Sequence, residues 1–126
     1  MALFETIREI LMELLDVEAA EMAPKTYLVR DLGVESIDFL ELAVALNGHF
    51  GIEVHDDTVF LRNLRLHVSE AGERGASTLN YLRGHYPFLP EDRLDEMLAD
   101  MDGGPVIQVR DLESYVRWQM NSAKAA

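Results

Sequence analysis

Ser36 is the residue whose position most strongly suggests chemistry, because it lies between acids in the stretch DLGVESIDFLEL, residues 31–42. A serine at the start of a helix can cap that helix, attack a substrate or carry an attached group. Hydrolytic serines usually occupy a G-x-S-x-G turn. Here GVESID lacks the second glycine, and Glu35 and Asp38 would oppose an oxyanion. Hydrolysis is therefore disfavoured, whereas capping and attachment both remain open.

Histidine and cysteine provide no sign of a metal site. The spacing of the four histidines does not match H-E-x-x-H or another ligand motif. These residues are His49, His55, His67 and His85. We expect each of them to be a surface or packing histidine, and we expect no metal site. The chain has no cysteine, which excludes disulfides, thiolate catalysis and thiolate zinc sites.

Acidic residues dominate the charge: 23 Asp and Glu against 11 Lys and Arg give a formal net charge of −12. Most of this charge lies in residues 1–57, which hold 13 acids and 3 bases. Such a surface repels nucleic acid and favours partners with basic surfaces, so we expect no nucleic-acid binding. The first residues, MALFETIREILMELL, interrupt their apolar positions with acids. We therefore expect no secretion signal and no membrane span, and by default a cytoplasmic location. We also expect a monomer.

The spacing of apolar residues predicts helices throughout the chain, and hence an all-α fold. With 126 residues, of which 48% are apolar, we expect one domain over residues 1–126. Helices are expected at residues 3–15, 36–50, from about 57, at 77–84, at about 90–102 and at 109–120. Residues 16–35 are expected to form an ordered loop, Gly51 to end the second helix, and the final NSAKAA to fray.

The predicted helix at residues 36–50 carries two apolar stripes on opposite sides. The larger stripe is expected to face the core and consists of Phe39, Leu42, Ala43, Leu46 and Phe50. The smaller stripe consists of Ile37, Leu40 and Val44, and it is flanked by Glu35, Asp38 and Glu41. Because a helix in a small domain has one buried side, we expect the smaller stripe to be an exposed docking surface. The alternative is that the segment at about residues 62–104 covers it.

The residues around Ser36 resemble the attachment motif of acyl carrier proteins, D-L-G-x-[DE]-S-[LI]-D followed by E-L. In this chain the motif reads DLGVESID at residues 31–38, with Glu41 and Leu42 after it. The resemblance covers about residues 1–61 and 105–120, where VRDLESYV is similar to the fourth helix of that family. It implies a four-helix bundle with an additional helical insertion, about residues 62–104, between the third and last helices.

The resemblance also implies a function. Ser36 would carry a 4′-phosphopantetheine arm, transferred from coenzyme A by a phosphopantetheinyl transferase. The arm would hold acyl intermediates as thioesters in fatty-acid, polyketide or lipid-modification biosynthesis, which makes the chain a non-catalytic carrier and a phosphoprotein. Basic surfaces on the transferase and on acyl-transferring or acyl-modifying enzymes are expected to bind Glu35, Ile37, Asp38, Leu40, Glu41 and Val44. The alternative is an unmodified protein-interaction module that retains the carrier fold, in which Ser36 only caps the helix.

Two departures from the usual carrier pattern bear on the cargo. Phe39 stands where many relatives have a smaller residue, so it either reshapes the acyl pocket or fills the core. The insertion either encloses a longer or bulkier acyl chain, docks dedicated partner enzymes, or only stabilises the fold. Its apolar cluster favours a role in partner or cargo specificity, and consists of Tyr81, Tyr86, Phe88 and Leu89.

Overall fold

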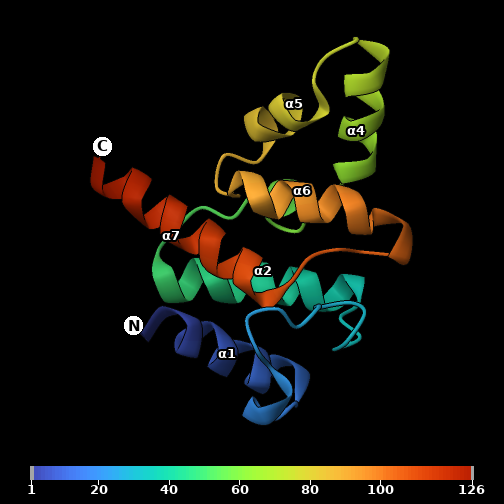
Figure 1. Ribbon diagram of the computed structural model, residues 1–126. Coiled ribbons are helices and arrows are strands. Elements are labelled where there is room, and N and C mark those ends of the chain that lie inside the picture. The colour runs from blue at the N-terminus through green and yellow to red at the C-terminus, as the bar shows by residue number, and fades with distance from the viewer. Residues whose placement is uncertain (1, 126) are drawn as a thin grey trace.

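A four-helix bundle forms the body of the protein in the computed structural model, which describes residues 2–125 (Figure 1). Its helices are α1 (Ala2–Leu15), α2 (Ser36–Phe50), the single turn α3 (Asp56–Val59) and α7 (Val109–Ala125). Both α1 and α3 pack against α2 and α7. This arrangement confirms the all-α, carrier-like fold that the sequence predicts.

Helices α1 and α2, which precede and contain Ser36, form where the spacing of the apolar residues predicts them. In α1, Ile7, Ile10 and Leu11 are all buried, as expected for residues three and four positions apart on one helical face. Helix α2 ends at Gly51, whose φ of 63° is the left-handed conformation that closes many helices, and its N–H donates to the carbonyl of Asn47. The predicted bounds of α2 are confirmed at both ends.

The loop between α1 and α2 is fixed to the start of α7. It contains one short 3-10 turn, Ala19–Glu21. The N–H of Leu28 donates to the carbonyl of Ile107 at 3.1 Å, and the N–H of Val109 donates to the carbonyl of Thr26 at 3.0 Å. These bonds hold the chain just before Ser36 against a segment far away in sequence, so the loop is ordered, as predicted.

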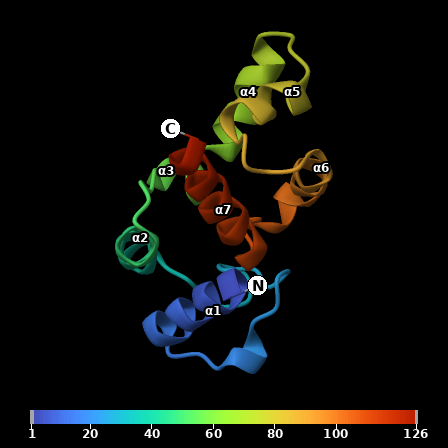
Figure 2. The same ribbon diagram turned by 90° about the vertical axis from the view of Figure 1, so that its left-hand side faces the viewer.

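The insertion consists of three further helices and one 3-10 turn. They are α4 (Leu64–Glu73), α5 (Thr78–His85), α6 (Glu91–Asp100) and the 3-10 turn η2 (Met101–Gly103). Helix α5 packs against both α4 and α6. In both views α4 and α5 project beyond α6, at the end of the molecule opposite α1 (Figures 1 and 2).

The helix predicted to start near Asp57 is confirmed at its start, because α3 begins at Asp56, but α3 does not continue into α4. The chain instead turns between α3 and α4, and Leu61 has a φ of 58°. Val59, Phe60 and Leu61 are all buried. On a continuous helix these three residues would spread over about 200°, so at least one would face outward. The turn allows all three to enter the core.

Three of the four residues in the apolar cluster of the insertion lie in the interior, which the sequence-based interpretation did not anticipate, whereas Tyr81 is half-buried. Tyr86, Phe88 and Leu89 are buried and belong to the same hydrophobic core as the bundle. Phe88 meets the ring of Tyr115 edge-on at 5.1 Å between centroids and lies 6.1 Å from the ring of Trp118. The cluster therefore joins the insertion to α7, and its apolar character is explained by packing.

The end of α7 also differs from the prediction. The backbone stays helical to Ala125, whereas the segment after Met120 was expected to fray. This segment contains no glycine or proline, and its alanines and lysine favour the helix. Ala126 lies outside the described residues. Over residues 2–125, no helix is long and apolar enough to cross a membrane.

Candidate functional site

Ser36 is the first residue of α2, and its side chain is exposed. The residue before it, Glu35, occupies the N-cap position, and the Glu35 N–H donates to Oδ2 of Asp38 at 2.9 Å. Within the described chain, the Ser36 hydroxyl has no hydrogen-bond partner. The hypothesis that Ser36 is only a helix cap is therefore wrong: Glu35 and Asp38 form the cap, and the hydroxyl is free.

The turn before Ser36 is held by the residues of the DLG motif. Val34 is buried, and its N–H donates to the carbonyl of Leu28 at 3.0 Å. Gly33 has a φ of 68°, a left-handed conformation that glycine adopts without steric cost. Burial of Val34 and the turn at Gly33 therefore place Ser36 on the surface at the start of the helix.

The start of α2 suits an attached phosphodiester. The first N–H groups of a helix lack partners within the helix, and the helix dipole favours an anion there. Because the Ser36 side chain is exposed, a bulky group on its oxygen meets no buried surroundings. Glu35 and Asp38 add negative charge close by, so a basic surface on a bound enzyme would offset their repulsion of the phosphate.

The smaller apolar stripe of α2 is exposed to solvent, as predicted. The exposed fractions of Ile37, Leu40 and Val44 are 63%, 55% and 73%. Glu35 and Glu41 are also exposed, whereas Asp38 is half-buried. The alternative that the insertion covers this stripe is wrong, because all three apolar residues are exposed in the complete fold.

A cavity of about 290 Å³ lies where α2, the turn after α3 and the insertion meet. Phe39, one helical turn after Ser36, forms one wall, and its ring lies 4.7 Å from that of Phe60. Val29 lines the cavity from the loop, while Leu64 and Met101 line it from the insertion. Sequence reasoning placed Phe39 on the inner face of α2 and left open whether Phe39 and the insertion shape a pocket; the structure shows that both line this cavity.

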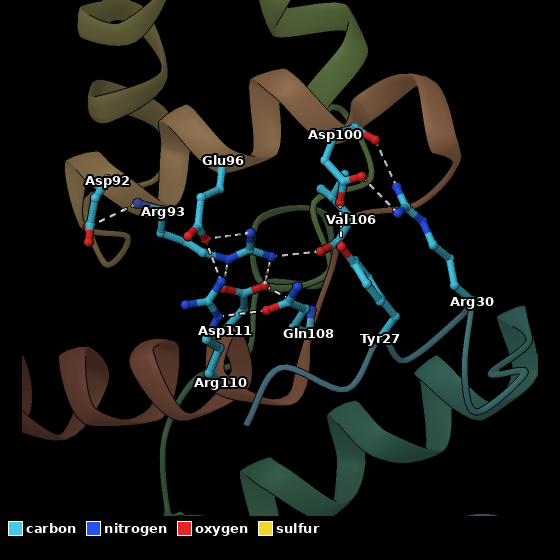
Figure 3. A network of polar contacts seen from close by, with 10 residues as sticks. All are labelled: Tyr27, Arg30, Asp92, Arg93, Glu96, Asp100, Val106, Gln108, Arg110 and Asp111. Atoms are coloured by element: carbon cyan, nitrogen blue, oxygen red, sulfur yellow. Dashed lines mark hydrogen bonds and ion pairs between the residues drawn. The ribbon is translucent and has the colours of Figure 1, made fainter. Parts of the chain in front are cut away.

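A polar network ties the loop before Ser36 to the end of α6 (Figure 3). The Tyr27 hydroxyl donates to Oδ2 of Asp100, and Nη1 of Arg30 donates to Oδ1 of Asp100 at 2.9 Å. Nη2 of Arg30 also donates to the carbonyl of Gly104 at 2.8 Å. The hydrogen bond from Tyr27, followed by that from Arg30, lowers the pKa of Asp100, which therefore stays charged.

A buried ion pair fastens α6 to the start of α7 in the same network (Figure 3). Arg93 and Asp111 are only 4% and 1% exposed, and two hydrogen bonds of 2.9 Å join them. Arg93 also donates to the carbonyl of Val106, and Asp111 accepts from the N–H of Gln108 at 2.8 Å. Burial disfavours the charge on Arg93, but its bonds to Asp111 outweigh that cost and raise its pKa.

Two of the four histidines lie side by side, which their spacing in the sequence did not indicate. The rings of His67 on α4 and His85 on α5 stack at 3.7 Å between centroids. Nδ1 of His67 lies 3.1 Å from Oε1 of Glu70. His49 and His55 are exposed, as expected for surface histidines.

Fold and site together describe a small helical bundle with a free serine at a helix start, and comparison with known proteins identifies its family. Residues 5–65 match the family model described as "phosphopantetheine attachment site". The chain is 46% identical over 57 residues to the acyl carrier proteins of Helicobacter pylori strains G27 and HPAG1, which covers 45% of this chain and 73% of each relative. The acyl carrier protein of Helicobacter pylori strain ATCC 700392 / 26695 is 44% identical over the same length.

The chain therefore belongs to the acyl carrier protein family, whose covalent cofactor is 4′-phosphopantetheine. When bound, this cofactor supplies a thiol that holds an acyl group as a thioester. The family match ends at residue 65, so most of the insertion lies beyond it.

Proposed function

We propose that Ser36 carries 4′-phosphopantetheine and that the protein delivers acyl intermediates to enzymes of fatty-acid, polyketide or lipid-modification biosynthesis without catalysing a reaction itself. The observation that carries this proposal is the exposed, unbonded hydroxyl of Ser36 at the start of α2, inside the segment that matches the attachment-site family. Attachment needs no base from this chain, because the transferase activates the hydroxyl and takes the arm from coenzyme A.

Intact-mass analysis tests this proposal against the unmodified interaction module. After incubation with coenzyme A and a broad-specificity phosphopantetheinyl transferase, a carrier gains the mass of one arm. A protein that gains nothing with several transferases would instead be an interaction module that only shares the carrier fold.

We propose further that the chain folds as one unit, in which residues 1–61 and 105–120 form the carrier core and residues 62–104 the insertion. The shared hydrophobic core supports this division, because Leu82 and Leu94 from the insertion belong to the same buried cluster as Leu11 from α1. The insertion therefore contributes to one stable core instead of folding as a second domain.

The docking face consists of Glu35, Ile37, Asp38, Leu40, Glu41 and Val44, and we assign it to the transferase and to acyl-transferring enzymes. Exposed aliphatic residues rimmed by acids suit a partner that offers an apolar patch inside a basic surface. Burial of such residues contributes affinity, while the acids steer the encounter.

Leu40→Asp is expected to raise the KM of the transferase for this protein about tenfold or more, since the loss of a central apolar contact costs more than 1 kcal/mol. The thermal midpoint should stay unchanged, because Leu40 is on the surface. Leu66→Asp is the matched control, because Leu40 and Leu66 are both 55% exposed but Leu66 lies on α4. Equal KM values for the two variants would contradict the assignment of this face.

We assign the cavity beside Phe39 to the acyl chain. Its walls at Phe39, Phe60, Leu64 and Met101 are apolar, and Phe39 is one helical turn from the attachment serine. Because Leu64 and Met101 belong to the insertion, this segment shapes the space that is open to the cargo. The cavity therefore supports the hypothesis that the insertion serves cargo specificity.

An acyl chain that ends in an environment-sensitive fluorophore tests this assignment. Attached to the arm, the fluorophore should emit at shorter wavelength than in water, because it enters an apolar cavity. Phe39→Trp fills part of the cavity and should return the emission toward its value in water. Phe50→Trp is the control, since Phe50 is also half-buried on α2 but does not line the cavity. An emission that is the same in all three proteins would show that the cargo lies elsewhere.

A further inference from the structure

Three potential metal ligands converge on the insertion, between α4 and α5. His67 and Glu70 lie three residues apart on α4, and His85 is the last residue of α5. The ligand atoms of all three side chains lie within 4.8 Å of one another. Two imidazoles and one carboxylate form a donor set that suits Zn²⁺ and other late divalent transition metals, whereas Ca²⁺ and Mg²⁺ prefer oxygen alone.

The surroundings of Glu70 resemble the support that metal ligands usually have. The Tyr81 hydroxyl donates to Oε1 of Glu70 at 3.2 Å, and the same oxygen lies 3.1 Å from Nδ1 of His67. The contact from Tyr81, which is not one of the three ligands, fixes the direction of the Glu70 side chain before the metal arrives. Glu70 is thus oriented in advance, and both Glu70 and His67 are only partly exposed.

The three potential ligands lie between two short helices, so a bound metal would stabilise the packing of α4 against α5. Helices α4 and α5 have 10 and 8 residues, and the buried side chains on them are Leu64, Ala71 and Leu82. Helices this short are marginal on their own, and a small unit with few core residues gains most from a cross-link. The pair projects from the rest of the molecule (Figures 1 and 2). One ion held by His67 and His85 would tie the two helices together.

We propose that His67, Glu70 and His85 bind one divalent transition-metal ion, Zn²⁺ by donor type, which clamps α4 to α5. A water molecule completes the tetrahedral shell. The two rings now stack with only 18° between their planes, so one ring has to turn for both nitrogens to face the ion. His85 is exposed and is free to make this movement. The proposal does not depend on the modification of Ser36.

The positive charge of Arg74, close to the proposed site, disfavours metal binding. The guanidinium of Arg74 lies over the ring of Tyr81, 5.7 Å from its centroid, and its charge repels a second cation. Arg74 is exposed, so its replacement leaves the core intact. Arg74→Ala is therefore expected to tighten metal binding.

Isothermal titration of the untagged, metal-free protein with Zn²⁺ tests the site, together with Co²⁺ absorption as a spectroscopic readout of ligand geometry. We expect one ion per chain, a Co²⁺ spectrum of a four-coordinate site, and a higher thermal midpoint with Zn²⁺. His85→Ala should weaken binding at least tenfold and remove the thermal shift, and its exposed position allows the variant to fold. The control replaces both His49 and His55 by glutamine and should bind as the natural chain does.

Two results would overturn the proposal. One is equal Zn²⁺ affinity of the natural chain and His85→Ala, which includes the case in which neither binds. The other is loss of binding in the His49 and His55 control, because the ion would then belong to the exposed histidines.

Discussion

Ser36→Ala is expected to abolish phosphopantetheine loading completely while leaving the protein folded. The loss is complete because the hydroxyl oxygen is the atom that forms the phosphodiester, and alanine has no substitute for it. The fold should survive because this exposed hydroxyl makes no hydrogen bond within residues 2–125, so the change in the free energy of unfolding is about 0.5 kcal/mol or less. The cap of α2 remains, since it depends on Glu35 and Asp38.

The measurement is intact mass after incubation with coenzyme A and a transferase, with a thermal melt of the same sample. Ser69→Ala is the matched control, because Ser69 is also an exposed helical serine but lies on α4. It should load as fully as the natural chain. Loading of the Ser36→Ala variant would contradict the assignment and point to another hydroxyl.

Arg93→Ala is expected to lower the free energy of unfolding by about 3–5 kcal/mol, which is a large share of the stability of a small domain. The reason is the partner that remains: Asp111 is 1% exposed and would keep a buried charge without its counterion. The carbonyl of Val106 would lose its donor as well. Because this pair joins α6 to α7, the insertion should become the least protected part of the chain in hydrogen exchange.

Chemical denaturation measures the change in the free energy of unfolding. Two further variants test whether the loss comes from the buried ion pair. Arg83→Ala removes an ion pair to Glu91 whose side chains are 57% and 59% exposed, so it should change stability by about 1 kcal/mol or less. Replacing Arg93 and Asp111 together by methionine and leucine should restore part of the stability, since no lone charge remains buried. If Arg93→Ala cost no more than Arg83→Ala, the pair would not fasten the insertion.

Local patterns in the sequence were enough to predict the bundle and the candidate site. The period of the apolar residues and the glycine at position 51 set the bounds of α2, and two opposite stripes indicated which face stays exposed. Ser36 could be singled out because its neighbours match a family motif. These features depend on residues close together in the chain, which is why sequence reasoning reached them.

Features that depend on distant contacts could not be predicted in the same way. Arg93 and Asp111 were not predicted to form a buried pair, because only the packing of α6 against the start of α7 brings them together. The sequence did contain an indication that Arg93 is buried. Arg93 precedes Met97 by four residues, so the two side chains share the buried face of the same helix. His67 and His85 stand far apart in the sequence, and the turn between α4 and α5 brings them together.

The insertion illustrates how composition alone can mislead. Its aromatic residues suggested a surface for partners or cargo, yet Tyr86 and Phe88 are buried, and Phe88 packs against α7. The feature that does support a role in cargo binding, the cavity beside Phe39, is formed by residues from four separate segments. Such a cavity exists only once the tertiary structure is complete.

Peptide mapping by mass spectrometry of the protein purified from its own cells tests the central claim most directly. The account predicts that the peptide containing Ser36 carries one phosphopantetheine, free or acylated, in most molecules, and the acyl mass would identify the cargo. A Ser36 peptide that is entirely unmodified, in cells that load their other carriers, would contradict it.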